Sequence, residues 1–161
     1  MEDTASSVTL SELIARGGIY RNVSGEYKHG LFLNIINQLP DFSYLNRETL
    51  FNELIKREEL MSTGIGNGIA LPHPRMPLLK EGGAPFVAIA FPDQPLYWNA
   101  PDGNKVHTIF LIICRSSKEH LSVLSRINFL CKDEKIYPLL KAQAPADEII
   151  AAIRKAEAEW T

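Results

Sequence analysis

One histidine, His73, stands in a setting that favours chemistry, the stretch STGIGNGIALPHPR at residues 62–75. Three glycines precede it at alternate positions, Gly64, Gly66 and Gly68. Glycine adopts positive φ at no steric cost and lets other groups approach the backbone closely. A histidine after such a turn is suited to act as a nucleophile, because a neutral ring nitrogen is available near neutral pH.

Two prolines bracket this histidine. The apolar run at residues 69–71, Ile-Ala-Leu, predicts a short buried strand, and Pro72 and Pro74 then flank His73. Proline fixes its own φ and restricts the residue before it, so the imidazole is held in place at the end of the strand. The same residues also fit a plain turn before a strand. A Walker loop and a dinucleotide fingerprint are excluded, since no Gly-Lys-Ser/Thr follows and no Gly-x-Gly-x-x-Gly opens a helix.

The composition is that of an ordinary globular chain. The 161 residues suffice for a hydrophobic core, and we expect one domain over residues 1–161. Hydrophobic residues make up 45% and charged residues 22%, and the net charge of −2 argues against a nucleic-acid partner. We expect no membrane insertion and a cytoplasmic location, because no apolar run is long enough to span a bilayer and no basic n-region of a signal peptide is visible. Cys114 and Cys131 lie in apolar surroundings, which predicts free thiols rather than a disulfide.

The hydrophobic pattern predicts helices mixed with strands, and therefore an α/β fold. Near-continuous apolar runs predict central strands over residues 86–91 and 106–114. Between them, residues 93–105 are rich in Pro, Asn and Gly, which predicts an exposed excursion that carries Trp98. Helices are expected over residues 8–16, 26–39 and 133–142, after Asn46 as N-cap, after the capping box Ser116-x-x-Glu119 with Leu121 on its buried face, and from Pro145.

Three more residues have two interpretations each. Arg57 falls in the last turn of a predicted helix, where a solvated cation is favoured by the helix dipole, but its planar fork could also hold phosphoryl oxygens. His120 lies near a helix N-terminus, which favours a nearby anion, but it could also be a surface histidine. His107 begins a predicted strand, where a structural role is favoured. A metal site of His73, His107 and His120 is an alternative, but no pair has ligand spacing, so we expect no metal.

The run Ser-Thr-Gly-Ile-Gly-Asn-Gly-Ile-Ala-Leu-Pro-His, with Arg57 upstream, resembles the signature of enzyme IIA domains of the bacterial phosphoenolpyruvate-dependent phosphotransferase system. The type is fructose/mannitol, which includes the nitrogen-regulatory IIA proteins. The resemblance covers roughly residues 8–153 and implies a single domain with a central mixed β-sheet flanked by helices. It implies that His73 accepts a phosphoryl group, that Arg57 stabilises this group and that His120 is a second active-site histidine. The loop that supports the site would comprise Ser62, Thr63, Gly64, Gly66 and Gly68.

The resemblance also implies a phosphocarrier, with no cofactor other than the phosphoryl group on histidine. The expected donor is the phosphocarrier HPr or a paralogue, and the expected recipients are a IIB domain or regulatory target proteins. A chain without attached IIB or IIC domains favours the nitrogen-regulatory branch, and a sugar-specific IIA component is the alternative. Pro74 departs from the small residue common after this histidine, which could narrow the donor's approach. Near the site, we expect an apolar docking surface that includes Ile65, Leu71, Met76 and Trp98.

Overall fold

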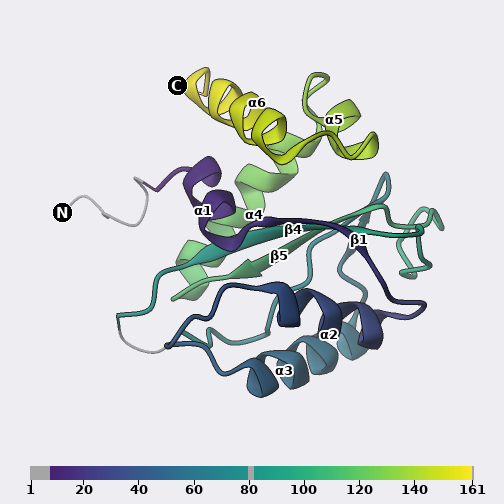
Figure 1. Ribbon diagram of the computed structural model, residues 1–161, viewed down its shortest axis with the longest axis vertical. Coiled ribbons are helices and arrows are strands. Elements are labelled where there is room, and N and C mark those ends of the chain that lie inside the picture. The colour runs from purple at the N-terminus through teal and green to yellow at the C-terminus, as the bar shows by residue number, and fades with distance from the viewer. Residues whose placement is uncertain (1–7, 80–81, 161) are drawn as a thin grey trace.

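A five-stranded mixed β-sheet forms the centre of the computed structural model, which describes residues 8–79 and 82–160 (Figure 1). The strand order is β1-β4-β5-β3-β2. The strands are β1 (Ile19–Val23), β2 (Gly64–Gly66), β3 (Ile69–Ala70), β4 (Phe86–Pro92) and β5 (Thr108–Ile113). The helices are α1 (Leu10–Gly17), α2 (Lys28–Gln38), α3 (Arg47–Leu60), α4 (Ser117–Cys131), α5 (Tyr137–Lys141) and α6 (Ala146–Ala158). The predicted α/β class, with a mixed sheet and flanking helices, is confirmed.

The two long central strands are buried along their whole length, as their unbroken apolar sequences predict. They pair antiparallel, with Phe86 opposite Ile113 and Ala90 opposite Ile109. On the outer sides, β1 pairs parallel with β4 and β3 pairs parallel with β5. A tight hairpin then adds β2 to β3 at the edge of the sheet.

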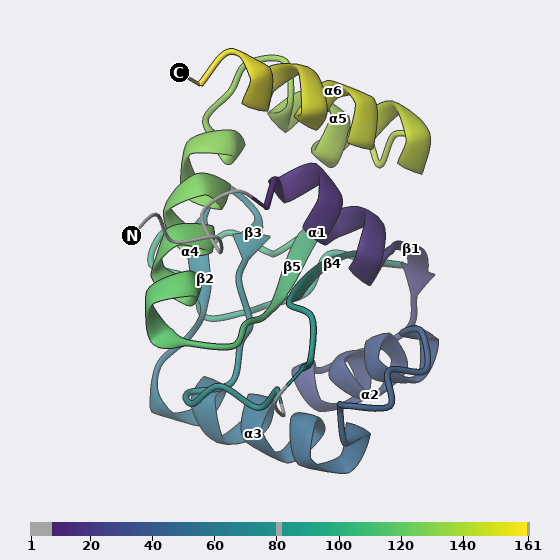
Figure 2. The same ribbon diagram turned by 90° about the vertical axis from the view of Figure 1, so that its left-hand side faces the viewer.

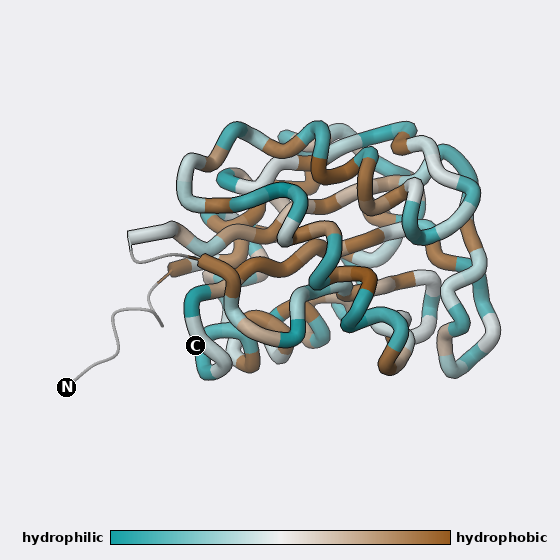
Figure 3. The backbone as a smooth tube through the Cα atoms, turned by 90° about the horizontal axis from the view of Figure 1, so that it is seen from below, coloured by the Kyte–Doolittle hydropathy of each residue, from teal (hydrophilic) through white to brown (hydrophobic). Residues whose placement is uncertain are grey.

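Helices cover both faces of the sheet, and α6 packs on the outer side of α1 (Figures 1 and 2). One hydrophobic core joins the sheet to α1, α4, α5 and α6, and a second core lies between the sheet and α2 and α3. Seen from the side of α2 and α3, the hydrophobic segments gather in the interior and the hydrophilic ones at the periphery (Figure 3). No helix in the described part of the chain is both long and apolar enough to cross a membrane.

Side-chain caps fix where several helices begin. The side chains of Thr9, Asn46 and Ser116 accept hydrogen bonds from backbone N–H groups three residues on, at the starts of α1, α3 and α4. The cap at Ser116 confirms the predicted helix start. The other half of the predicted capping box, in which the Glu119 carboxylate would accept the N–H of Ser116, is wrong. The Glu119 carboxylate instead accepts the N–H of Arg115 at 2.8 Å and pairs with the Arg115 guanidinium.

Three further expectations about packing were wrong. Leu121 is 65% exposed, because α4 buries the face that carries Val123, Ile127 and Leu130. The helix expected over residues 133–142 is confined to α5, because Pro138 has no N–H to donate and fits only the first helical turn. Segment 93–105 is not simply an exposed excursion: a bridge between Leu96 and Val106 ties it down, and Trp98 is fully buried.

Candidate two-histidine site

Two imidazole rings face each other at the end of β3. His73 follows this strand, and His120 lies in the first turn of α4, with their ring centroids 4.3 Å apart. The backbone pairing of β3 with β5 continues up to the first histidine, because Ile112 donates its N–H to the carbonyl oxygen of Pro72 at 3.1 Å. The sheet therefore positions one ring and a helix N-terminus positions the other.

A backbone hydrogen bond selects the tautomer of His73. Its Nδ1 lies 2.7 Å from the carbonyl oxygen of Leu71, and a carbonyl accepts only, so Nδ1 carries the proton. The lone pair of the neutral ring is therefore on Nε2. The acceptor carbonyl belongs to Leu71, two residues before His73 in the chain. The sequence gives little sign of this bond, since the acceptor is a main-chain group.

Both rings are held in their neutral form near pH 7. Burial lowers the pKa of His73 below its usual value, the Arg57 charge lowers it further, and the hydrogen bond to Leu71 and the charge of Glu58 oppose this. Burial, followed by the charges of His73 and Arg57, lowers the pKa of His120 to about 4. A neutral imidazole is the nucleophilic form, so this electrostatic setting favours attack by Nε2 of His73.

Arg57 belongs to the same site. It lies in the last turn of α3, where its Nη1 donates to the carbonyl oxygen of Met61 at 2.6 Å. Its charge acts on both imidazoles, since it lowers the pKa of His73 and of His120. The structure thus brings together the three residues that the sequence singled out from three separate elements.

The loop residues expected to support the site divide into two groups, and Ser62 and Thr63 form the first. The Thr63 carbonyl accepts the N–H of Leu71 at 3.0 Å, next to the histidine. The Ser62 hydroxyl donates to the carbonyl oxygen of Trp98 at 2.6 Å and accepts from the Gly64 N–H at 3.1 Å. These two residues therefore attach the strand that carries His73 to segment 93–105.

The glycines shape the hairpin rather than the site. The turn between β2 and β3 has positive φ at Asn67 (55°) and Gly68 (79°), as a two-residue hairpin turn requires. A Cβ atom on Gly68 would lie 2.3 Å from the His107 ring, and one on Gly64 would lie 2.8 Å from Cβ of Ala100. Glycine is therefore needed at these positions for close packing, and the turn lies at the end of β3 remote from His73.

His107 is not part of the two-histidine site. Its N–H bonds to Gly68 at the start of β3, whereas His73 lies beyond the end of this strand, level with Ile112. Five residues of strand separate the two levels, which is roughly 16 Å. The three-histidine ligand set is thus wrong. Within residues 8–79 and 82–160, no three His, Cys, Asp or Glu side chains are placed to hold a metal ion.

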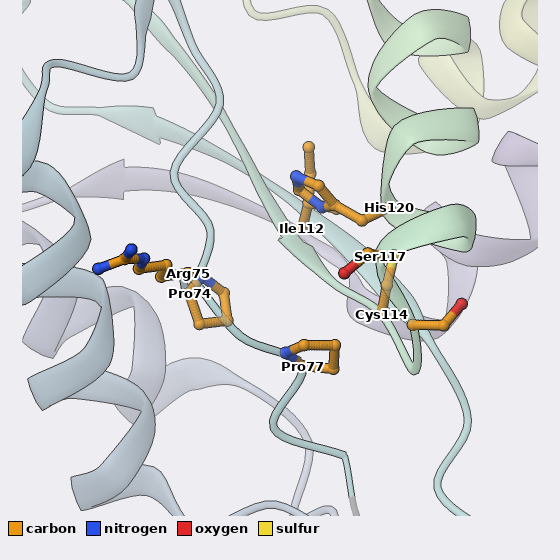
Figure 4. A pocket seen from close by; sticks show the side chains of 8 residues that line it. Pro74, Arg75, Pro77, Ile112, Cys114, Ser117 and His120 are labelled. Atoms are coloured by element: carbon orange, nitrogen blue, oxygen red, sulfur yellow. The ribbon is translucent and has the colours of Figure 1, made fainter.

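A small pocket of about 30 Å³ adjoins His120 (Figure 4). Its lining comes from the segment after His73 and from the start of α4: Pro74, Arg75, Pro77, Ile112, Cys114, Ser116, Ser117 and His120. Figure 4 shows the Arg75 side chain directed away from His120. Pro74 is buried and forms a wall of this pocket, opposite His120 in the lining (Figure 4).

The fold and the site together define an α/β domain with a histidine-pair centre suited to group transfer. The family model described as "Phosphoenolpyruvate-dependent sugar phosphotransferase system, EIIA 2" matches residues 12–156. A nitrogen regulatory protein of Pseudomonas aeruginosa is 30% identical over 148 residues, which cover 88% of this chain and 92% of that protein. The fructose-specific EIIABC component of Bacillus subtilis is 28% identical over 149 residues, which cover 91% of this chain and 23% of that protein.

Solved structures agree with these sequence relatives. The nitrogen regulatory protein IIA-Ntr of Neisseria meningitidis has a TM-score of 0.76 and 30% identity, and the match covers 89% of this chain and 97% of that one. The chain therefore belongs to the EIIA 2 family of the phosphoenolpyruvate-dependent sugar phosphotransferase system. It is a phosphotransfer component, and its relatives include both nitrogen regulatory proteins and sugar-specific ones.

Proposed function

We propose that the protein is a phosphocarrier that accepts a phosphoryl group on Nε2 of His73 from HPr or an HPr-like paralogue. The observation that carries this proposal is the 2.7 Å bond from Nδ1 to the Leu71 carbonyl, which leaves the lone pair on Nε2. The bond between phosphorus and the donor breaks as the bond to Nε2 forms, and the Nδ1 proton stays in place. No cofactor is needed, because phosphoryl transfer depends mainly on positioning and charge stabilisation.

Two groups near Nε2 are proposed to stabilise the transferring group. Arg57 would present its planar fork to the phosphoryl oxygens, as guanidinium groups do in bidentate phosphate recognition. His120, whose ring centroid lies 4.3 Å from that of His73, would add a hydrogen-bond donor. Both roles rest on the placement of these groups around His73.

The test is to locate the phosphate after incubation with phosphoenolpyruvate, enzyme I and HPr. We expect one acid-labile phosphate per chain, lost in His73→Ala and retained in the matched control His29→Ala, since His29 is an exposed histidine of α2 and is not one of the two facing rings. The ³¹P–¹⁵N coupling should place phosphorus on Nε2. Label that persists in His73→Ala would reject the proposal, and coupling to Nδ1 would reject the proposed tautomer.

We infer further that the protein reports its phosphorylation state to partner proteins, as expected of a nitrogen-regulatory IIA protein. A phosphoryl group adds roughly −1.5 to −2 charge at one point of the surface. Ile65 and Met76 are 41% and 64% exposed and could be buried by a partner. Leu71 and Trp98 were also expected in this docking surface, and that expectation was wrong, because both side chains belong to the core.

A partner that covers this surface without a cation would bind the unmodified form better, because the phosphate must lose its water. The test measures binding of purified candidate partners, including an isolated IIB domain, to wild type, His73→Ala and His73→Glu. Discrimination between His73→Ala and His73→Glu by a partner other than IIB would support the regulatory function. If only the IIB domain binds, and it binds all forms equally, the sugar-specific alternative becomes the better account.

A further inference from the structure

We propose that Glu58 is a positioning residue for His73, acting through Thr63 and the Leu71 carbonyl to keep the proton of the imidazole on Nδ1. The proposal rests on the proposed function, because the free Nε2 is the atom that would accept the phosphoryl group. It concerns a residue that the sequence motif does not single out. The evidence for the proposal is a continuous chain of hydrogen bonds that connects Glu58 to His73.

The first link joins α3 to the strand-bearing loop. The Glu58 carboxylate accepts two hydrogen bonds from Thr63, from the backbone N–H at 3.0 Å and from Oγ1 at 2.6 Å. The Glu58 side chain is 6% exposed, and Thr63 is 5% exposed. Two bonds from one residue to one carboxylate fix both its backbone and its side chain.

The second link fixes the carboxylate itself. Nζ of Lys28 lies 2.8 Å from Oε1 of Glu58 and 5.0 Å from the centroid of the Trp98 ring. The indole N–H of Trp98 donates to Oγ1 of Thr63 at 3.1 Å, so this hydroxyl accepts one bond and donates another. A buried ion pair adds little net stability, and its attested use is to specify one arrangement.

The third link leads to the imidazole. The Thr63 carbonyl accepts the N–H of Leu71 at 3.0 Å, and the Leu71 carbonyl accepts Nδ1–H of His73 at 2.7 Å. Pro72 stands between these two residues, has no N–H of its own and holds the preceding residue extended. A displacement of Thr63 would therefore move the carbonyl that selects the tautomer.

The last turn of α3 thus contributes two neighbouring residues to the site. Arg57 lowers the pKa of both imidazoles, and Glu58 binds the backbone N–H of Thr63 in the loop before β3. The charged groups that shift the pKa of His73 come from α3, as Arg57 and Glu58, and the titratable ring of His120 on α4 lies next to it. The negative charge of Glu58 also counters the effect of Arg57 on the pKa of His73.

The experiment records the ¹⁵N shifts of the imidazole nitrogens of His73 at pH 8 in unphosphorylated protein, together with the rate of transfer from phosphorylated HPr. In Glu58→Gln and Thr63→Val, we expect the ratio of the Nδ1–H to the Nε2–H tautomer to fall about fivefold. Transfer should slow about tenfold, since the nucleophile leaves its attack geometry. Thr63→Ser keeps the hydroxyl and should retain the wild-type tautomer ratio and rate. Glu59→Gln removes an exposed carboxylate next to Glu58 on α3 and should also retain the wild-type tautomer ratio and rate.

Wild-type ¹⁵N shifts in folded Glu58→Gln and in Thr63→Val would overturn the proposal. If Glu58→Gln does not fold, Thr63→Val and Thr63→Ser decide the matter alone. The tautomer is measured without phosphate, so its result stands apart from the proposed function. If wild type takes no phosphate on His73 while the tautomer still shifts in Glu58→Gln, the proposed function fails and the positioning of the ring is upheld.

Discussion

Replacing Arg57 by alanine tests how much of the transfer rate depends on one guanidinium. A charge-assisted hydrogen bond contributes roughly 1.5–3 kcal/mol, and at 1.36 kcal/mol per decade its loss from the transition state slows transfer by about 10- to 150-fold. The fold should be little affected, because Arg57 is partly exposed and its hydrogen bond goes to the carbonyl of the exposed Met61. We therefore expect a large kinetic effect and a change in unfolding free energy below about 1.5 kcal/mol.

Two further variants separate charge from shape. Arg57→Lys keeps the positive charge, so the pKa of His120 should stay at about 4, but the ammonium lacks the planar fork and should restore the rate only in part. Lys56→Ala removes a neighbouring charge whose side chain is 71% exposed, and it should transfer at the wild-type rate. A general loss of positive charge on α3 is thereby distinguished from the loss of a local contact.

The assay is rapid-quench transfer from phosphorylated HPr, with substrate concentration varied so that binding and chemistry are resolved. The effect should fall on the first-order step rather than on the affinity for HPr, because the proposed contact is made to the transferring group. Wild-type rates in Arg57→Ala would refute the reasoning. An equal loss in Lys56→Ala would assign the effect to long-range attraction of the donor.

Three predictions concern the fold. Glu157 of α6 accepts the N–H groups of Leu10 and Ser11 at 2.6 and 2.8 Å, so Glu157→Gln should cost about 1–2 kcal/mol in urea unfolding, and the exposed control Glu159→Gln should cost little. Gly68→Ala should lose about 2 kcal/mol or more, since Gly68 has φ +79° and a Cβ would lie 2.3 Å from a histidine ring, whereas Gly30→Ala in α2 should gain about 0.5–1 kcal/mol. The pKa of His120 is depressed to about 4, so the unfolded chain binds its proton more readily, and stability should fall as the pH drops from about 6.5 towards 4. That fall should be smaller in His120→Gln.

Much of the fold could be predicted because its local signals agree with its packing. The strands β4 and β5 are continuous apolar runs, and they are buried throughout. The N-cap at Asn46 and the short strand before Pro72 were also confirmed. The burial of Trp98 could not be predicted, since it depends on an indole N–H that bonds across the chain to Thr63. A segment rich in turn residues can still deliver one aromatic side chain to the core.

The candidate site could be predicted in its residues but not in its supports. His73 was identified from its prolines, and Arg57 and His120 from a family resemblance, and the structure brings all three together. The Leu71 carbonyl and Glu58 were missed, because a main-chain acceptor has no sequence signature and a glutamate in a helix is ordinarily solvated. The only sign of Glu58 was its place next to Arg57.

Phosphorylation of His73 should raise the pKa of the neighbouring His120. In the unmodified protein, burial, the charge that His73 gains when it is protonated and the charge of Arg57 hold the pKa of His120 at about 4. A phosphoryl group places negative charge on His73 instead, next to a ring whose centroid lies 4.3 Å from that of His73. An opposite charge at such a distance favours the protonated form and raises a pKa by about 1 to 3. Titration of His120 by NMR in the two forms measures this change. His107 serves as an internal reference, because its backbone bonds to Gly68 at the end of β3 opposite to His73. Equal pKa values for His120 in the two forms would mean that the phosphoryl group points away from the second imidazole, and its proposed role in stabilising that group would fall.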